Sequence, residues 1–127
     1  MKICVSAVAN SLDAQVDPRF GRCQYLVIVD YESMEFETIS NLAASAMHGA
    51  GIQSAQTVVN KGVIVVITGS VGPNAFQALS SAGIKVVNSG FGTIREVVER
   101  YKKGEQMETI GPTVGGHSGM SGGRGRR

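Results

Sequence analysis

Val63-Ile64-Val65-Val66-Ile67 is a run of five consecutive β-branched residues near the middle of the chain. A run without polar alternation is typical of a strand that is covered on both faces, as in a parallel sheet. Gly72 and Pro73 follow shortly after it. Proline suits the first turn of a helix, because its missing N–H loses no intrahelical bond. The stretch therefore predicts a buried parallel strand followed by a helix.

The residues that follow repeat this pattern of strand and helix. Gly83 marks the end of the helix, and Ile84–Val87 is another short apolar strand. Thr93 and Glu96 form a capping box, in which each side chain satisfies a backbone N–H at the start of a further helix. Gly104 ends that helix. Alternation of this kind predicts right-handed parallel crossovers.

The N-terminal part contains three strand-like segments. Lys2–Val8 and Tyr25–Val29 are dominated by apolar residues, and Met34–Ile39 alternates between polar and less polar residues. This order predicts an antiparallel meander whose third strand is a half-solvated edge. A helix follows and stops at Gly62, and its inward face is expected at three positions with helical spacing: Ile52, Ala55 and Val59.

Together these elements predict an α/β fold with a five-stranded mixed sheet. A three-strand antiparallel meander is followed by two parallel strands, with about three helices on the faces of the sheet. Such sheets bind ligands outside the carboxyl ends of the parallel strands, near a switch in strand order. The loops after Val8, Ile67 and Val87 are expected to open at that end.

The composition indicates one globular domain and a different C-terminal segment. A chain of 127 residues with 43% hydrophobic and 17% charged residues is typical of a soluble single domain. We expect this α/β domain to span residues 1–110. Residues 111–127 contain seven of the 17 glycines and no apolar period. We expect them to form a flexible Gly/Arg-rich tail.

Charge and hydropathy exclude several classes of function. The tail carries three of the 12 basic residues, so nine remain against ten acidic residues in the body, which has a charge of about −1. This balance argues against a broad nucleic-acid surface, although the tail can support weak, salt-dependent RNA binding. No apolar run approaches the roughly 18 residues of a membrane span. Two cysteines do not suggest a disulfide framework, and we expect a cytoplasmic protein.

The stretch Asp17-Pro18-Arg19-Phe20-Gly21-Arg22-Cys23 concentrates binding chemistry between two strands. Cys23 is the best metal-ligand candidate, because thiolates bind iron in iron–sulfur clusters and neighbouring arginines lower a thiol pKa. The alternative is a small buried hydrophobe, the role expected for Cys4 within its strand. With one plausible thiolate, the chain does not enclose a conventional four-cysteine cluster. A cluster would be bound partly by other groups, exposed, or shared between chains.

Other polar residues offer two interpretations each. Arg19 and Arg22 either hold an anionic group through charge-assisted hydrogen bonds or order the loop through salt bridges to Asp17 or Asp13. Gly72 and Asn74, with Gly69, form either an anion cradle of backbone N–H groups or a tight turn. The spacing of these glycines fits neither a phosphate-binding Walker loop nor a dinucleotide fingerprint.

The residues do not predict an enzyme. A nuclease would need carboxylates clustered on the sheet to hold two metal ions, and Ile3–Val8 carries none. With two histidines in the chain, no Ser–His–Asp set is visible. We therefore expect binding without catalysis.

Five motifs recur in the same order in a known family: Val16–Cys23, Gly49–Gln53, Ile67–Gly69, Gly72–Phe76 and Gly92–Glu96. Over residues 1–104 the chain resembles the dinitrogenase iron–molybdenum cofactor biosynthesis family, the small proteins similar to NifX and to the C-terminal domain of NifB. The resemblance implies a ribonuclease-H-like fold and the binding or carrying of an iron–sulfur-type or iron–molybdenum cofactor precursor. Many nitrogenase-associated members have His where this chain has Arg19, and many stand-alone members have no nitrogenase function.

The resemblance also implies where the cofactor precursor would lie. Family members often have His near the glycine pair at 49–51, so His48 joins Cys23 as a candidate metal ligand. The other cofactor-binding candidates are Arg22, Arg19, Gly72 and Asn74. The implied partners are cofactor-assembly or acceptor proteins. The alternative function is an anion- or protein-binding module of the same fold with no nitrogenase role, or weak RNA binding through the tail.

Overall fold

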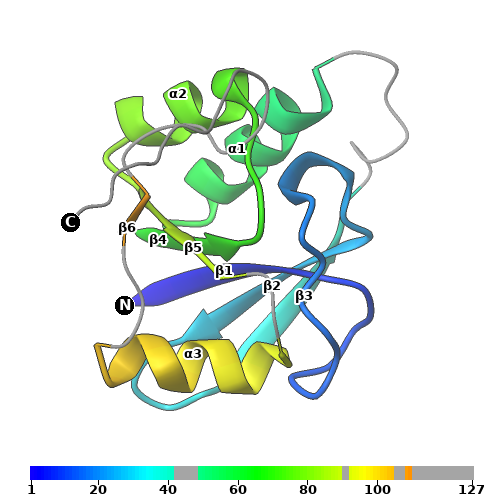
Figure 1. Ribbon diagram of the computed structural model, residues 1–127, viewed down its shortest axis with the longest axis vertical. Helices are drawn as coiled ribbons and strands as arrows, with labels where there is room; N and C mark the ends of the chain where they lie inside the picture. Colours follow the sequence, from blue (N-terminus) through cyan, green and yellow to red (C-terminus); the bar gives the residue numbers. More distant parts are fainter. Residues whose placement is uncertain (42–48, 90–91, 105–107, 110–127) are drawn as a thin grey trace, which may run out of the picture.

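A mixed six-stranded sheet forms the middle layer of the molecule (Figure 1). The computed structural model describes residues 1–41, 49–89, 92–104 and 108–109. In chain order the strands are β1 (Lys2–Ala7), β2 (Tyr25–Asp30), β3 (Phe36–Ser40), β4 (Val65–Thr68), β5 (Lys85–Asn88) and β6 (Glu108–Thr109). Their order across the sheet is β3-β2-β1-β4-β5-β6.

The strand directions confirm the predicted topology. β1, β2 and β3 form an antiparallel meander, and β4 pairs parallel to β1 on its other side. β5 then pairs parallel to β4, and the two-residue β6 adds an antiparallel edge that the sequence did not predict. The first five strands have the order expected of the ribonuclease-H-like fold. After β1 the next strand is added toward one edge of the sheet, and after β4 the next strand is added toward the other edge. The switch in strand order therefore lies between β1 and β4.

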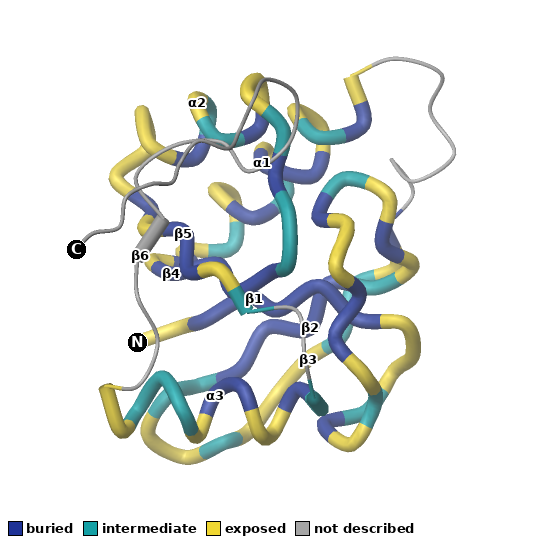
Figure 2. Tube along the Cα trace, in the orientation of Figure 1, coloured by how far each residue is buried: buried dark blue, intermediate teal, exposed yellow. Residues whose placement is uncertain are grey.

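In the described ranges, three α-helices cover the two faces of the sheet. α1 (Ala50–Asn60) and α2 (Pro73–Ser81) pack on one face, and α3 (Ile94–Lys102) packs on the other (Figure 1). Successive residues of a strand point to opposite faces, so each strand supplies both cores. Cys4 and Val66 lie on the side of α1 and α2, whereas Ile3, Val5 and Val65 lie on the side of α3. The buried inner sides of the helices and the buried central strands are visible in Figure 2.

Of the three residues predicted on the inward face of α1, only Ala55 is buried. The buried residues of the helix are Ala50, Ser54, Ala55 and Val58, while Ile52 and Val59 are 40% and 41% exposed. Gly51 explains the difference, because a Cβ there would come within 3.0 Å of Cβ of Ala75 in α2. Near its start the helix packs through glycine and alanine, which allow close approach, and Ile52 and Val59 turn outward although Val58 is buried.

Two predicted helix starts are confirmed. Pro73 occupies the first turn of α2. At α3, the Thr93 hydroxyl accepts a hydrogen bond from the Glu96 N–H, and the Glu96 carboxylate accepts one from the Thr93 N–H, which completes the capping box. Within the described ranges, no helix is both long and apolar enough to cross a membrane.

Candidate functional site

A pocket of about 390 Å³ lies where the loops after β1 and β4 meet the first turns of α1 and α2. The loop after β1 contributes a short 3₁₀ helix, η1 (Phe20–Arg22). Arg22 is its last residue, and Arg19 directly precedes it. The lining side chains with polar groups are Arg19, Arg22, Ser70 and Asn74, and the other lining residues are glycine, alanine, Phe20, Ile52 and Pro73. The pocket opens at the carboxyl ends of the parallel strands, as predicted.

The loop that carries η1 is fastened to β1 and to the loop after β4 by hydrogen bonds, and the one from the Ser6 hydroxyl is buried. The Asp17 N–H donates to the carbonyl oxygen of Ser6 (2.8 Å), and the buried Ser6 hydroxyl donates back to the carbonyl oxygen of Asp17 (2.6 Å). One step further, the Ser70 hydroxyl donates to the carbonyl oxygen of Pro18 (2.8 Å), and the Phe20 N–H donates to the carbonyl oxygen of Ser70 (3.2 Å). β1 and the loop after β4 therefore hold η1 in place.

Two glycines let these segments approach one another. A Cβ on Gly69 would lie 2.7 Å from Cβ of Pro18, and a Cβ on Gly21 would lie 2.9 Å from Cα and N of Gly51. Contacts below 3.0 Å are not tolerated by fixed backbone atoms. Gly21 therefore brings η1 directly onto the first turn of α1.

Arg19 forms the salt bridge that the sequence analysis offered as one interpretation. The Asp17 carboxylate, 6% exposed, accepts from the backbone N–H of Arg19 (2.9 Å) and from its Nε (3.3 Å). The Arg19 side chain is nevertheless 66% exposed and lines the pocket, as does the exposed Arg22. Ordering the loop and presenting positive charge are therefore compatible roles.

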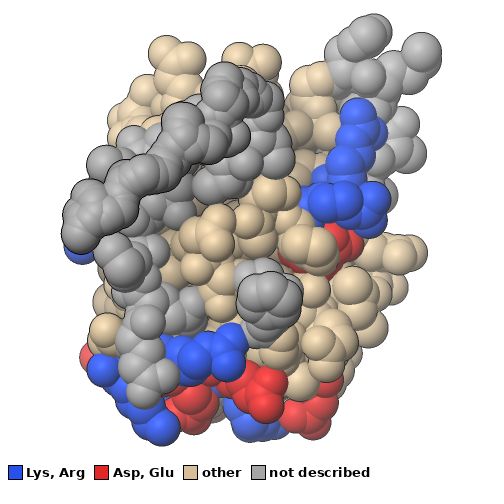
Figure 3. All heavy atoms as spheres, in the orientation of Figure 1, with Lys and Arg blue, Asp and Glu red and all other residues tan. Residues whose placement is uncertain are grey.

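The electrostatics of the pocket favour an anion. The first N–H groups of a helix have no acceptor within the helix, and the helix dipole adds positive potential there. α1 and α2 both begin at the pocket, after Gly49 and Gly72, without a capping side chain or an acidic residue in the first turn. Among the described residues, none that lines the pocket is acidic. In Figure 3, basic atoms gather over the η1 loop with a small acidic area below them, while most other charged atoms lie over α3.

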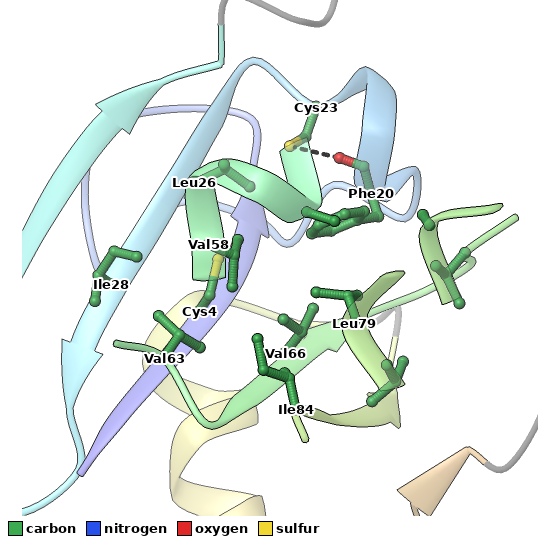
Figure 4. Close-up of a cluster of buried hydrophobic side chains, with 14 residues drawn as sticks. Cys4, Phe20, Cys23, Leu26, Ile28, Val58, Val63, Val66, Leu79 and Ile84 are labelled. Atoms are coloured by element: carbon green, nitrogen blue, oxygen red, sulfur yellow. Dashed lines mark hydrogen bonds between the residues drawn. The ribbon is translucent and has the colours of Figure 1, made fainter. Parts of the chain in front are cut away.

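Cys23 lies beneath the pocket and does not line it. Its side chain is fully buried, and its Sγ donates a hydrogen bond to the carbonyl oxygen of Phe20 (3.1 Å; Figure 4). Burial, with a smaller contribution from the Asp17 carboxylate, raises the pKa of the Cys23 thiol from 9.0 to about 12. The alternative of a small buried hydrophobe fits this environment, and a role as thiolate ligand stays a prediction. Cys4 is likewise buried, in the core where it was expected.

The structure brings together most of the predicted site residues. Arg19, Arg22, Gly72 and Asn74 line one pocket, and His48 lies outside the described residues. The sequence analysis did not predict that Ser70 and the first turn of α1 line the pocket. The Gly-Ala-Gly at 49–51, directly before an apolar period, was the available signal for a helix start that can bind an anion.

The side chains of the pocket suit recognition of an anion through hydrogen bonds, without direct bonds to a metal ion. In the part of the chain that the structure describes, no three or more His, Cys, Asp or Glu side chains are grouped so as to hold a metal ion. The pocket instead offers guanidinium groups, a hydroxyl, an amide and backbone N–H groups. These groups donate hydrogen bonds to negatively charged oxygen or sulfur atoms.

Comparison with known proteins identifies relatives of similar length. Residues 1–104 match the model of the family described as dinitrogenase iron-molybdenum cofactor. The apo form of the orange protein from Desulfovibrio gigas is 43% identical with a TM-score of 0.85, covering 87% of this chain and 94% of that one. A candidate NifB protein from Thermotoga is 36% identical with a TM-score of 0.75, covering 84% and 91%. An uncharacterized protein of Methanocaldococcus jannaschii is 32% identical over 109 residues, covering 83% and 92%.

Proposed function

Because the chain belongs to the dinitrogenase iron-molybdenum cofactor family, we propose that it is a non-enzymatic protein that binds and carries an anionic cofactor precursor of iron–sulfur or iron–molybdenum type. The precursor is cargo, received from one protein and passed to another. The partners on this proposal are cofactor-assembly or acceptor proteins.

The observation that carries this proposal is the convergence of positive groups on one pocket. Arg19 and Arg22 face the same space as the starts of α1 and α2, and in the part of the chain that the structure describes no carboxylate lines that space. Guanidinium and helix N–H groups form their strongest hydrogen bonds with charged acceptors, and sulfide- or thiolate-bearing clusters are anions of this kind. The apolar walls from Phe20, Ile52 and Pro73 suit a large anion with low charge density better than a small, strongly hydrated one.

We propose binding without turnover, and the chemistry of the described pocket side chains agrees with this proposal. Arginine stays protonated at any physiological pH and does not serve as a general base there. Ser70 donates its hydroxyl proton to the carbonyl oxygen of Pro18, and among the described residues that line the pocket there is no histidine or carboxylate to activate it. The described part of the site therefore holds and orients a ligand.

Anaerobic titration with a water-soluble, thiolate-capped [4Fe–4S] cluster tests the proposal. We expect the visible absorption of the cluster to co-elute with the wild-type protein in gel filtration. Arg22→Gln should weaken the binding about tenfold, since a hydrogen bond to a charged group is worth about 1.5–3 kcal/mol. Arg95→Gln is the matched control, because Arg95 is an exposed arginine on α3 paired with Asp13 on the other side of the molecule. A wild-type protein that elutes colourless, or equal losses in both variants, would contradict the proposal.

The same titration separates two further questions. Cys23→Ser abolishes binding if the thiolate is a ligand, and leaves the affinity near the wild-type value if the pocket binds through Arg19, Arg22 and N–H groups alone. For the second question, inorganic phosphate is added as a competitor of the cluster at constant ionic strength. If phosphate displaces the cluster at comparable concentration, the pocket is a general anion site and the alternative function with no nitrogenase role is favoured.

A further inference from the structure

One buried amide side chain connects the segments behind the pocket. Asn41, at the end of β3, is 8% exposed. Its Nδ2 donates to the carbonyl oxygens of Cys23 (2.9 Å) and Gly21 (3.3 Å), the residues on either side of Arg22 at the end of η1. Its Oδ1 accepts from the hydroxyl of Ser54 in α1 (2.9 Å), and its backbone N–H donates to the carbonyl oxygen of Gln24 (2.9 Å).

Ser54 determines which way this amide points. Ser54 is fully buried in the interior of α1, where a serine costs stability unless its hydroxyl has a partner. The hydroxyl donates to Asn41, so the amide oxygen faces α1 and the amide nitrogen faces η1. The carbonyls of Gly21 and Cys23 require a donor on that side, and the amide supplies it.

The connection lies directly behind the site. Gly21 is the residue whose backbone contacts Gly51 in the first turn of α1, and it immediately precedes Arg22. Gly21, Arg22 and Gly51 all line the pocket. Asn41 thus restrains η1 from the rear at the point where η1 meets α1.

We infer that Asn41, oriented by Ser54, is a positioning residue for the pocket: it holds η1 against α1, so that the arginines and the helix start face the same ligand. The inference rests on the proposed function and deepens it, because it explains how the site is held ready before the ligand arrives. Without this tether, binding must also order the loop, and the cost of ordering lowers the affinity. Neither residue contacts the ligand.

Asn41→Asp tests the inference with almost no change in shape. The substitution replaces the amide donors with an acceptor that faces two carbonyl oxygens. We expect its affinity for the thiolate-capped [4Fe–4S] cluster to fall about tenfold. Ser54→Ala, which removes one hydrogen bond and leaves the amide in place, should lower the affinity by about threefold. Val97→Ala is the matched control, because it opens a cavity in the core on the side of α3 and should destabilise the protein while the affinity stays unchanged.

A spectroscopic readout separates positioning from a merely structural role. In the ligand-free Asn41→Asp protein, the amide NMR signals of Gly21 and Arg22 should broaden through exchange between loop conformations, and saturating cluster should sharpen them. In the Val97→Ala protein these signals should stay sharp. If Asn41→Asp does not fold, Ser54→Ala carries the same comparison.

The outcomes distinguish this inference from the proposed function. A wild-type protein that does not bind the cluster overturns the proposed function, and the NMR comparison of ligand-free proteins still tests the positioning. A wild-type protein that binds, with Asn41→Asp or Ser54→Ala matching Val97→Ala in both affinity and signal width, overturns the inference. Selective loss of affinity with broadened η1 signals supports it.

Discussion

At the scale of the residue, the environment of Cys23 reverses the chemistry that its neighbours suggest. Arg19 and Arg22 are close in sequence and favour a thiolate, yet the Cys23 side chain is fully buried in the core on the side of α1 and α2 (Figure 4). There the loss of hydration, with a smaller contribution from the Asp17 carboxylate, raises the pKa of the thiol to about 12, although hydrogen bonds from Asn41 and from backbone groups lower it. The neutral thiol is the form that the fold stabilises.

This raised pKa predicts a loss of stability at alkaline pH. Above pH 9 the unfolded chain ionises Cys23 while the folded chain keeps it protonated, so the unfolded state binds fewer protons and stability falls as the pH rises from about 9 to about 12. Urea unfolding at about pH 8 and about pH 10.5 measures the change, and Cys23→Ala should lose less stability between these values than the wild type. Equal losses in the two proteins would show that Cys23 does not contribute.

At the scale of the element, the contact between η1 and α1 depends on the absence of side chains. Gly21 and Gly51 bring two backbones together, and Gly51 also admits Ala75 of α2. The first turns of α1 and α2 thereby converge on the loop that carries the arginines. Asn41 and Ser54 then secure this contact from behind. The pocket is a consequence of how closely three elements can pack.

Gly21→Ala should therefore damage both stability and binding. The added Cβ would lie 2.9 Å from backbone atoms of Gly51, so η1 must move away from α1. We expect a loss of about 1–3 kcal/mol in the free energy of unfolding and a weaker affinity for the [4Fe–4S] cluster.

Gly62→Ala is the control for this comparison. Gly62 has a positive φ of 73° but open space around it, so the cost there is about 1 kcal/mol of backbone strain, with the affinity unchanged. Chemical denaturation and the cluster titration measure both quantities. Wild-type affinity in Gly21→Ala would contradict the role given to the contact.

At the scale of the whole molecule, charge is segregated. Acidic and basic side chains alternate over α3, whereas basic groups mark the pocket side (Figure 3). The body of the chain is about −1 in net charge, and the C-terminal residues carry three further arginines. On the proposed function, a local basic pocket on a nearly neutral body suits a compact anionic cofactor precursor better than a long polyanion.

A chain that ends after Gly111 should behave as the complete domain. We expect its thermal midpoint and its affinity for the [4Fe–4S] cluster to equal those of the full chain, because the family match ends at residue 104. Weak RNA binding at low salt, measured by fluorescence anisotropy, should disappear with the tail. A lowered midpoint would mean that the removed residues stabilise the domain, and unchanged RNA affinity would place that binding elsewhere.

Local patterns in the sequence were sufficient for the order, type and direction of the main elements. The β-branched run at 63–67, Pro73 and the Thr93–Glu96 capping box each specify a local conformation through sterics or a hydrogen bond within a few residues. Pro73 and the capping box lie where they were predicted, whereas the strand begins only at Val65 and leaves Ile64 45% exposed. The loop with Arg19 and Arg22 was recognisable for the same reason: its charged groups and its glycine are adjacent in the chain.

Only the tertiary structure decided which residues share the pocket and which lie beneath it. Ile52 and Val59 face outward because glycine and alanine permit a closer contact on the other side of α1, and apolar spacing alone does not report such contacts. Cys23 is buried by elements that are distant in sequence, and Asn41 acts across gaps of 13 to 20 residues. Burial, pKa and hydrogen-bond partnership depend on neighbours in space, and those neighbours exist only once the sheet and its helices have assembled.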